Sequence, residues 1–125
     1  MMLIAVALGG AVGAVLRYGI GLVCLALWGT GFPIATMLVN IVGSFLMGVF
    51  ASYLTLTGIA TQEIRGFLTI GLLGAFTTFS AFSMDAVTLW ERGLMTQAIG
   101  YVILSILLSI GALVAGMILT RHILT

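Results

Sequence analysis

Apolar residues run through almost the whole chain in four long windows, with short polar or turn-forming segments between them. A membrane-spanning helix needs about 20 consecutive, mostly apolar residues, and each window reaches that length. The windows cover approximately residues 3–27, 34–56, 65–90 and 95–120. The pattern predicts an all-α membrane protein in which four transmembrane helices form a single domain over residues 1–125.

The composition fits a surface that faces lipid. Of the 125 residues, 62% are hydrophobic and 6% are charged, whereas a soluble domain is roughly one quarter charged. The competing membrane architecture, a β-barrel, needs alternating segments of about ten residues, and the long unbroken apolar runs argue against it. Lysine is absent and there is no basic patch, so nucleic acid is not an expected partner.

The arginines give almost no orientation signal. Cytoplasmic loops normally carry an excess of Lys and Arg. With both termini on one side, Arg65 and Arg121 lie on that side; Arg92, and Arg17 if it is counted toward the first loop, lie on the other. Two interpretations remain open. The chain either has too few charges for the rule to act on, or inserts in both orientations and pairs as an antiparallel dimer.

Small and hydrogen-bonding residues recur at helical spacing in three windows. They are Gly9, Gly13, Arg17 and Gly21 in the first, Thr36, Asn40, Ser44, Gly48 and Ser52 in the second, and Ser105, Ser109, Ala112 and Gly116 in the fourth. Such faces usually allow helix backbones to approach one another. An Arg near mid-membrane, however, costs about 2.5 kcal/mol or more on insertion scales. Arg17 therefore either snorkels or faces an ion path, and Asn40 either bonds another helix or lines that path.

The third window contains the run Gly71–Ser83 (GLLGAFTTFSAFS). Glycines and the β-branched pair Thr77 and Thr78 are poor helix formers, yet they stand in the middle of a predicted span. One interpretation is a helix broken in mid-membrane, which the bilayer tolerates only where the break is buried in protein or lines a cavity. The other is an ordinary helix with packed phenylalanines.

The chemistry of the polar positions excludes most enzymes. The chain has no nucleophile with a neighbouring base, and its single histidine, His122, lies near the end of the sequence. The expected inward groups are neutral donors, namely the Asn40 amide and serine hydroxyls, and no acidic ring of the kind that draws cations is present. Ring edges of Phe79 and Phe82 are weakly positive. This set favours a pathway for a small anion.

Three motifs resemble the CrcB or Fluc family of fluoride channels: Gly9–Tyr18 (GGAVGAVLRY), Asn40–Phe45 (NIVGSF) and Gly74–Ser83 (GAFTTFSAFS). They occur in the family's order, and the resemblance covers the whole chain. It implies a channel that passively exports fluoride and so protects the cell from its accumulation. It also implies a dual-topology homodimer in a prokaryotic plasma or inner membrane, in contact with lipid and carrying two antiparallel pores.

The resemblance further implies a structural sodium ion at the dimer centre, held by the backbone carbonyls of Gly74 and Thr77. The residues expected along the fluoride pathway, from the polar pattern and the resemblance together, are Asn40, Phe79, Phe82, Ser80, Ser83, Ser44, Ser109 and Arg17. Two positions depart from the family pattern: Ala75 and Ala81 stand where it commonly has Gly and Thr. Asp85 occupies a place where the family often has Glu.

Two alternatives from other functional classes stay open on the sequence. A small multidrug-type, proton-coupled exporter also has four short helices and a weak charge bias, and it would need an intramembrane carboxylate, for which Asp85 is the candidate. A non-transporting membrane subunit would need only packing faces and would have no reason for a break between Gly74 and Ser83.

Overall fold

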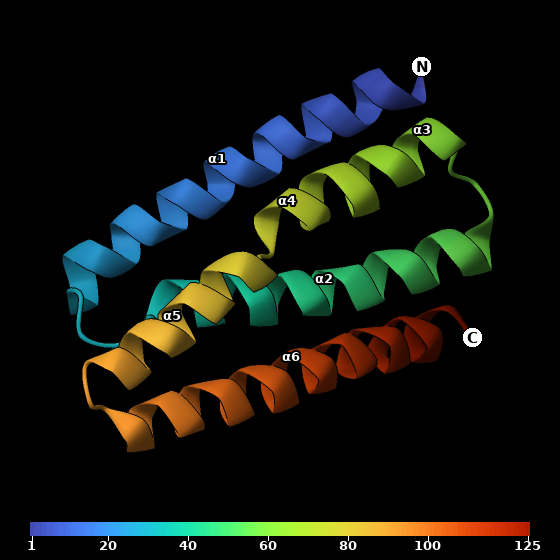
Figure 1. Cartoon of the computed structure of the whole chain (residues 1–125). Coiled ribbons are helices and arrows are strands. Elements are labelled where there is room, and N and C mark those ends of the chain that lie inside the picture. The colour runs from blue at the N-terminus through green and yellow to red at the C-terminus, as the bar shows by residue number, and fades with distance from the viewer.

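The computed structural model describes residues 1–125 and consists of helices without a strand (Figure 1). Three windows form continuous helices: α1 (Met2–Trp28), α2 (Ile34–Thr57) and α6 (Met95–Leu124). The third is divided into α3 (Gln62–Arg65), the π-helix η1 (Gly66–Leu73), α4 (Gly74–Phe76) and α5 (Phe79–Glu91). Four helical stretches are long and apolar enough to cross a membrane, so the prediction of an all-α protein with four spans is confirmed. We refer to Gln62–Glu91 as the third span.

Glycine and proline set the boundaries of the first two helices. The helix α1 ends before Gly29, whose φ is 74°, and α2 ends before Gly58, which has a left-handed conformation with φ 63°. Glycine adopts positive φ without the steric cost that a Cβ would add. Pro33 stands immediately before α2, where its missing N–H leaves no helical hydrogen bond unmade. The turn-forming segment expected between the first two windows therefore lies between Trp28 and Ile34.

The helices run side by side along one common direction, and both chain termini lie at the same end of the molecule (Figure 1). The helix α1 packs along η1 and α4, while α2 packs along α6. The helix α5 also contacts α6. The third span therefore begins beside α1 and ends beside α6, and α2 contacts both of its halves.

Close glycine contacts hold these helix pairs together. A Cβ on Gly13 of α1 would collide with the Leu72 carbonyl oxygen of η1. A Cβ on Gly48 of α2 would collide with the Leu113 carbonyl oxygen of α6. Backbones this close gain dispersion contacts that larger residues would prevent. For these glycines, the packing interpretation of the small-residue faces is confirmed.

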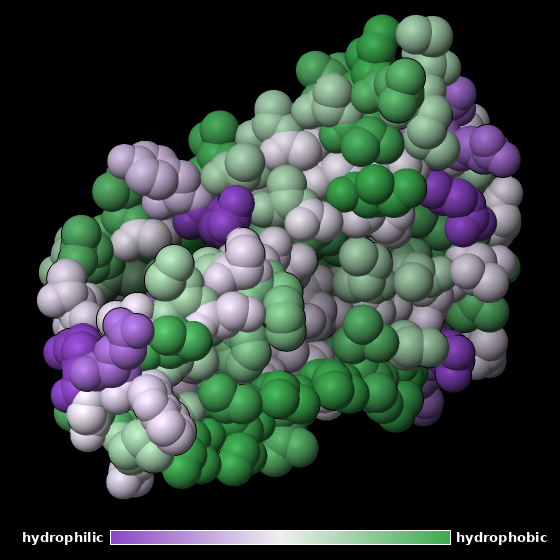
Figure 2. Space-filling view, in the orientation of Figure 1, coloured by the Kyte–Doolittle hydropathy of each residue, from purple (hydrophilic) through white to green (hydrophobic).

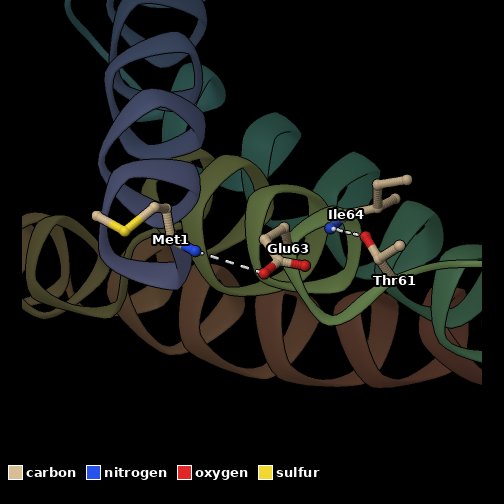
Figure 3. Close-up of polar contacts among 4 residues, drawn as sticks. All are labelled: Met1, Thr61, Glu63 and Ile64. Carbon is tan, nitrogen blue, oxygen red and sulfur yellow. Dashed lines mark hydrogen bonds and ion pairs between the residues drawn. The ribbon is translucent and has the colours of Figure 1, made fainter.

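A set of polar contacts fixes the end of the bundle at which the third span begins. The Thr61 hydroxyl accepts a hydrogen bond from the Ile64 N–H at 3.2 Å, and the amino group of Met1 lies 3.5 Å from Glu63 Oε1 (Figure 3). The Arg65 guanidinium donates to the Leu54 carbonyl at 2.6 Å, near the C-terminus of α2. Cationic donors are favourable at that end of a helix because the aligned peptide dipoles make it partially negative.

The outer surface is strongly apolar. Hydrophobic atoms cover the edge formed by α6, while many of the hydrophilic groups lie toward the two ends of the bundle (Figure 2). On α6, Leu107 and Ile110 are 63% and 62% exposed. Exposed apolar area of this extent is unfavourable in water but suits lipid, in which the aliphatic side chains contact acyl chains.

Candidate functional site

The backbone of the third span leaves helical geometry at two residues. The helix α4 ends at Phe76 and α5 begins at Phe79, and between them Thr77 (φ −82°, ψ 157°) and Thr78 (φ −152°, ψ 119°) are extended. The Thr77 N–H is the last before α5 to donate four residues back, to Leu73, so the N–H groups that follow it directly need other partners.

Asn40 of α2 supplies two of those partners. Its Nδ2 donates to the Thr78 carbonyl oxygen at 3.1 Å, and its Oδ1 accepts from the Thr78 N–H at 2.8 Å. Because the Thr78 N–H can only donate and its carbonyl can only accept, this pair fixes the orientation of the amide. The interhelical hydrogen bond considered for Asn40 is therefore present. One N–H of Nδ2 remains outside this pair, because a side-chain amide has two donors.

The threonine hydroxyls complete the interruption. Thr78 Oγ1 accepts from the Ala81 N–H at 3.1 Å, so Thr78 is the N-cap of α5, and it lies 3.3 Å from Ser80 Oγ. The Thr77 hydroxyl and N–H both donate to the Leu73 carbonyl, at 2.9 and 3.0 Å. An N-cap hydroxyl typically contributes about 1 kcal/mol to helix stability.

The interruption also deprives the carbonyls of residues 74–77 of their regular donors, and two of those donors now bond side chains. In a continuous α-helix the Thr78 N–H would donate to Gly74, and the Ala81 N–H would donate to Thr77. Both N–H groups donate to side chains instead. Carbonyl oxygens without strong donors are hard ligands of the kind that alkali cations prefer. The residues suggested for a sodium site therefore fit that ion chemically, and the chain has no cluster of His, Cys, Asp or Glu that would hold a transition metal.

A pocket of about 260 Å³ adjoins the interruption, between α2, α5 and α6. Its lining is Asn40, Ser44, Thr77, Thr78, Phe79, Phe82, Ser105, Ile106, Ser109 and Ile110. The hydroxyl oxygens of Ser105 and Ser109 are buried and have no hydrogen-bond partner in the chain. A buried hydroxyl without a partner costs about 1–3 kcal/mol, so these two groups call for a ligand or water in the pocket.

The two phenylalanines have very different environments. Phe82 is 9% exposed, whereas Phe79 is 79% exposed, and their ring centroids lie 5.6 Å apart with the planes inclined at 46°. The Phe82 ring also lies 5.3 Å from the ring of Tyr101, which is fully buried. Phe82 is therefore held by neighbours within the chain, while Phe79 presents its ring outward.

Five of the eight residues expected along the pathway lie together in the pocket: Asn40, Ser44, Phe79, Phe82 and Ser109. The other three do not line it. Ser80 is exposed, the Ser83 hydroxyl donates to the Phe79 carbonyl at 3.0 Å, and Arg17 is partly buried on α1 with no partner for its Nε.

Sequence reasoning did not assign two of the residues that form the site. Ser105 lines the pocket with only 4% of its surface exposed, and the Thr78 side chain caps α5. The signal for Ser105 was present, because it stands four residues before Ser109 on the same helical face. The signal for Thr78 was its position just before the renewed apolar run, where threonine is a favoured N-cap.

Asp85, the carboxylate considered for proton coupling, has a partner within the chain. The Tyr101 hydroxyl donates to Asp85 Oδ2 at 3.1 Å, which links α5 to α6. The Tyr101 ring also packs edge-on against Phe32, with centroids 5.6 Å apart. The carboxylate therefore belongs to a packed structural cluster beside Phe82.

Comparisons of the sequence with known proteins identify relatives of this chain. Residues 4–117 match the family model described as CrcB-like protein, Camphor Resistance (CrcB). A protein of Cereibacter sphaeroides named fluoride-specific ion channel FluC is 52% identical over 119 residues, covering 95% of this chain and 94% of that protein. Proteins of the same name from Rhodospirillum centenum and Paracoccus denitrificans are 51% and 47% identical. They cover 96% and 93% of this chain, and 95% and 91% of their own lengths.

Proposed function

Because the chain belongs to the CrcB-like family, we propose that it is a fluoride-selective ion channel through which fluoride leaves the cell passively. Such a channel limits the accumulation of fluoride and catalyses no chemical reaction. The geometric observation that carries the proposal is the pocket beside the helix interruption, in which the hydroxyls of Ser105 and Ser109 lack any protein partner.

The pathway runs through that pocket. Fluoride is small and strongly hydrated, so a selective path must replace its water with many donors. The pocket is lined by neutral donors of this kind: the free N–H of Asn40 and the hydroxyls of Ser44, Ser105 and Ser109. The weakly positive ring edges of Phe79 and Phe82 add further support for an anion. Ser80 and Ser83 lie just past the interruption and continue the pathway beyond the pocket. Arg17 belongs to the vestibule, where the ion is still hydrated.

The interruption lies in mid-membrane and forms the sodium site. Thr77 and Thr78 stand at the middle of the third span, which is the depth at which an isolated helix break would be most costly. The carbonyls of Gly74 and Thr77 would hold the ion, since both are free of their helical donors. A bound cation would supply fixed positive charge that offsets part of the cost of an anion in a low dielectric.

The functional unit is an antiparallel homodimer. Two carbonyls from one chain leave a sodium ion short of ligands, and a second copy related by a twofold axis doubles their number. The near balance of arginines on the two sides permits insertion in both orientations. Phe79, a pathway residue that is 79% exposed in the single chain, gains an enclosed environment beside a partner.

The protein is a multi-pass membrane protein, and its place is the plasma or inner membrane of a prokaryote, where residues 1–125 form a single transmembrane domain. The drug-exporter alternative has less support, because Asp85 already accepts a hydrogen bond from the buried Tyr101. A carboxylate that loads protons and cationic drugs needs instead to be accessible from both sides of the membrane in turn.

Ion efflux from proteoliposomes tests the function. Vesicles loaded with potassium fluoride and carrying the purified chain should release fluoride when valinomycin is added, because potassium then balances the charge. Vesicles loaded with potassium chloride serve as the selectivity control, and protein-free vesicles measure the leak. Release of chloride as fast as fluoride, or fluoride release no faster than the leak, would overturn the proposal.

A further inference from the structure

Two side-chain oxygens replace backbone carbonyls as hydrogen-bond acceptors at the helix interruption. Asn40 Oδ1 accepts the N–H of Thr78, and Thr78 Oγ1 accepts the N–H of Ala81. In a continuous helix those two N–H groups would donate to Gly74 and Thr77. We call Asn40 Oδ1 and Thr78 Oγ1 the substitute acceptors.

We propose that Asn40 and Thr78 are positioning residues for the cation site, because the substitute acceptors keep the Gly74 and Thr77 carbonyls free for a sodium ion. This inference rests on the sodium site included in the proposed function. Neither side chain needs to touch the ion. Each acts by holding an N–H group that would otherwise compete with sodium for the same carbonyl oxygen.

The competition follows from the geometry of the interruption. Without Thr78 Oγ1, the Ala81 N–H has no acceptor in a region where an unpaired N–H costs about 1–3 kcal/mol. The Thr77 carbonyl, four residues earlier, is the acceptor that helical geometry offers. The same argument applies to Asn40 Oδ1, the Thr78 N–H and the Gly74 carbonyl. If either N–H donated to its helical carbonyl, a helical turn would form again, and that carbonyl oxygen would be less available to a sodium ion.

Asn40 contacts both the interruption that holds the cation site and the pocket of the anion path. Its Oδ1 and one N–H bind the Thr78 backbone, while its second N–H is available to the pocket that Asn40 lines. Replacing Asn40 should therefore weaken sodium binding as well as fluoride passage. Thr78 separates the two effects better, because Thr78→Val removes the acceptor while valine suits its extended backbone.

Thermal unfolding of the purified protein in detergent tests the inference with a readout that is independent of ion flux. Sodium chloride is titrated against N-methylglucamine chloride at constant ionic strength, and the sodium concentration that gives half of the rise in Tm is recorded. Loss of groups that orient metal ligands typically weakens metal affinity about 10–100-fold. We expect a shift of that size for Thr78→Val and for Asn40→Leu.

Two control variants should retain the wild-type midpoint. Thr78→Ser keeps a hydroxyl acceptor, and Thr69→Val makes the same chemical change in η1, where the Thr69 hydroxyl only donates to the Arg65 carbonyl. A wild-type midpoint in both Thr78→Val and Asn40→Leu would overturn the inference, as would a shift in Thr78→Ser equal to that in Thr78→Val. If Thr78→Val does not fold in any salt, Asn40→Leu decides alone.

Failure of the inference is distinguishable from failure of the proposed function. Fluoride efflux by the wild-type protein, together with a sodium-dependent Tm that no variant alters, would refute the role of the substitute acceptors and leave the channel intact. A wild-type Tm that is indifferent to sodium would refute both the sodium site and this inference, while efflux would still decide whether the chain conducts fluoride.

Discussion

Replacing Asn40 by aspartate separates the two parts of its contact with Thr78. One carboxylate oxygen still accepts the Thr78 N–H, as Oδ1 does now at 2.8 Å. The other takes the place of Nδ2 and faces the Thr78 carbonyl oxygen, to which Nδ2 donates at 3.1 Å. A donor is thereby lost, and a negative charge is introduced on the wall of the pocket.

The size of the effect follows from the charge. Two unit charges 4 Å apart repel by about 4 kcal/mol at an effective dielectric constant of 20. Since 1.36 kcal/mol corresponds to a factor of ten, fluoride occupancy beside Asn40 should fall about 10³-fold. We therefore expect fluoride efflux from proteoliposomes carrying Asn40→Asp to fall to the level of protein-free vesicles.

Asn40→Leu removes the donors without adding charge, but it also removes the Oδ1 acceptor of the Thr78 N–H. Efflux of both variants is therefore measured at a sodium concentration that saturates the Asn40→Leu protein. Asn40→Leu should slow efflux less than Asn40→Asp does. Both variants are first checked for a folded species by size-exclusion chromatography. Folded Asn40→Asp that conducts at the wild-type rate would place the pathway away from Asn40. Equal losses in the two variants would show that the added charge is not the cause.

Three further predictions follow from other contacts. Gly48→Ala should lower the free energy of unfolding by about 1–3 kcal/mol, because the new Cβ meets the Leu113 carbonyl. Gly111→Ala, which has open space around the new Cβ, is the control and should keep the wild-type stability. Equal Tm values for the two variants would contradict the prediction. Tyr101→Phe and Asp85→Ala should be coupled by about 1–2 kcal/mol in a double-mutant cycle of unfolding, because each change alone removes their hydrogen bond. Strictly additive effects would show that this hydrogen bond contributes nothing. A C-terminal tag should be accessible from both sides of the membrane in similar amounts, and a single orientation in the unmodified chain would exclude the antiparallel dimer. Lysines added to one loop should bias insertion toward one orientation and reduce efflux.

The features that sequence predicted best are those that depend on local composition. The four apolar windows lie inside the four observed spans, because lipid requires long runs of apolar residues whatever the tertiary contacts. Gly13 and Gly48 could be recognised as packing positions from their spacing alone. The π-helical geometry of Gly66–Leu73 carried no comparable signal, because the same residues would also satisfy an α-helix.

The site was only partly predictable, because its contacts join distant parts of the chain. The sequence marked Asn40 as a costly polar residue but could not indicate that its partner is the backbone of Thr78, 38 residues away. The sequence indicated on which helix face each serine lies. The exact rotation of each helix, however, decides that Ser109 lines the pocket while the Ser83 hydroxyl donates to a carbonyl of its own helix. Rotation depends on packing against neighbours, which composition does not encode.

The bond between Asn40 and Thr78 has a consequence for how the chain enters the bilayer. A helix that satisfies all its own backbone groups can partition into lipid alone, but the third span cannot, because unpaired groups cost several kcal/mol each in hydrocarbon. Its missing partner lies on α2, which precedes it in the sequence and so leaves the ribosome first. The order of synthesis thus delivers the side chain that the later span needs, and we expect the two to enter the membrane as a hairpin.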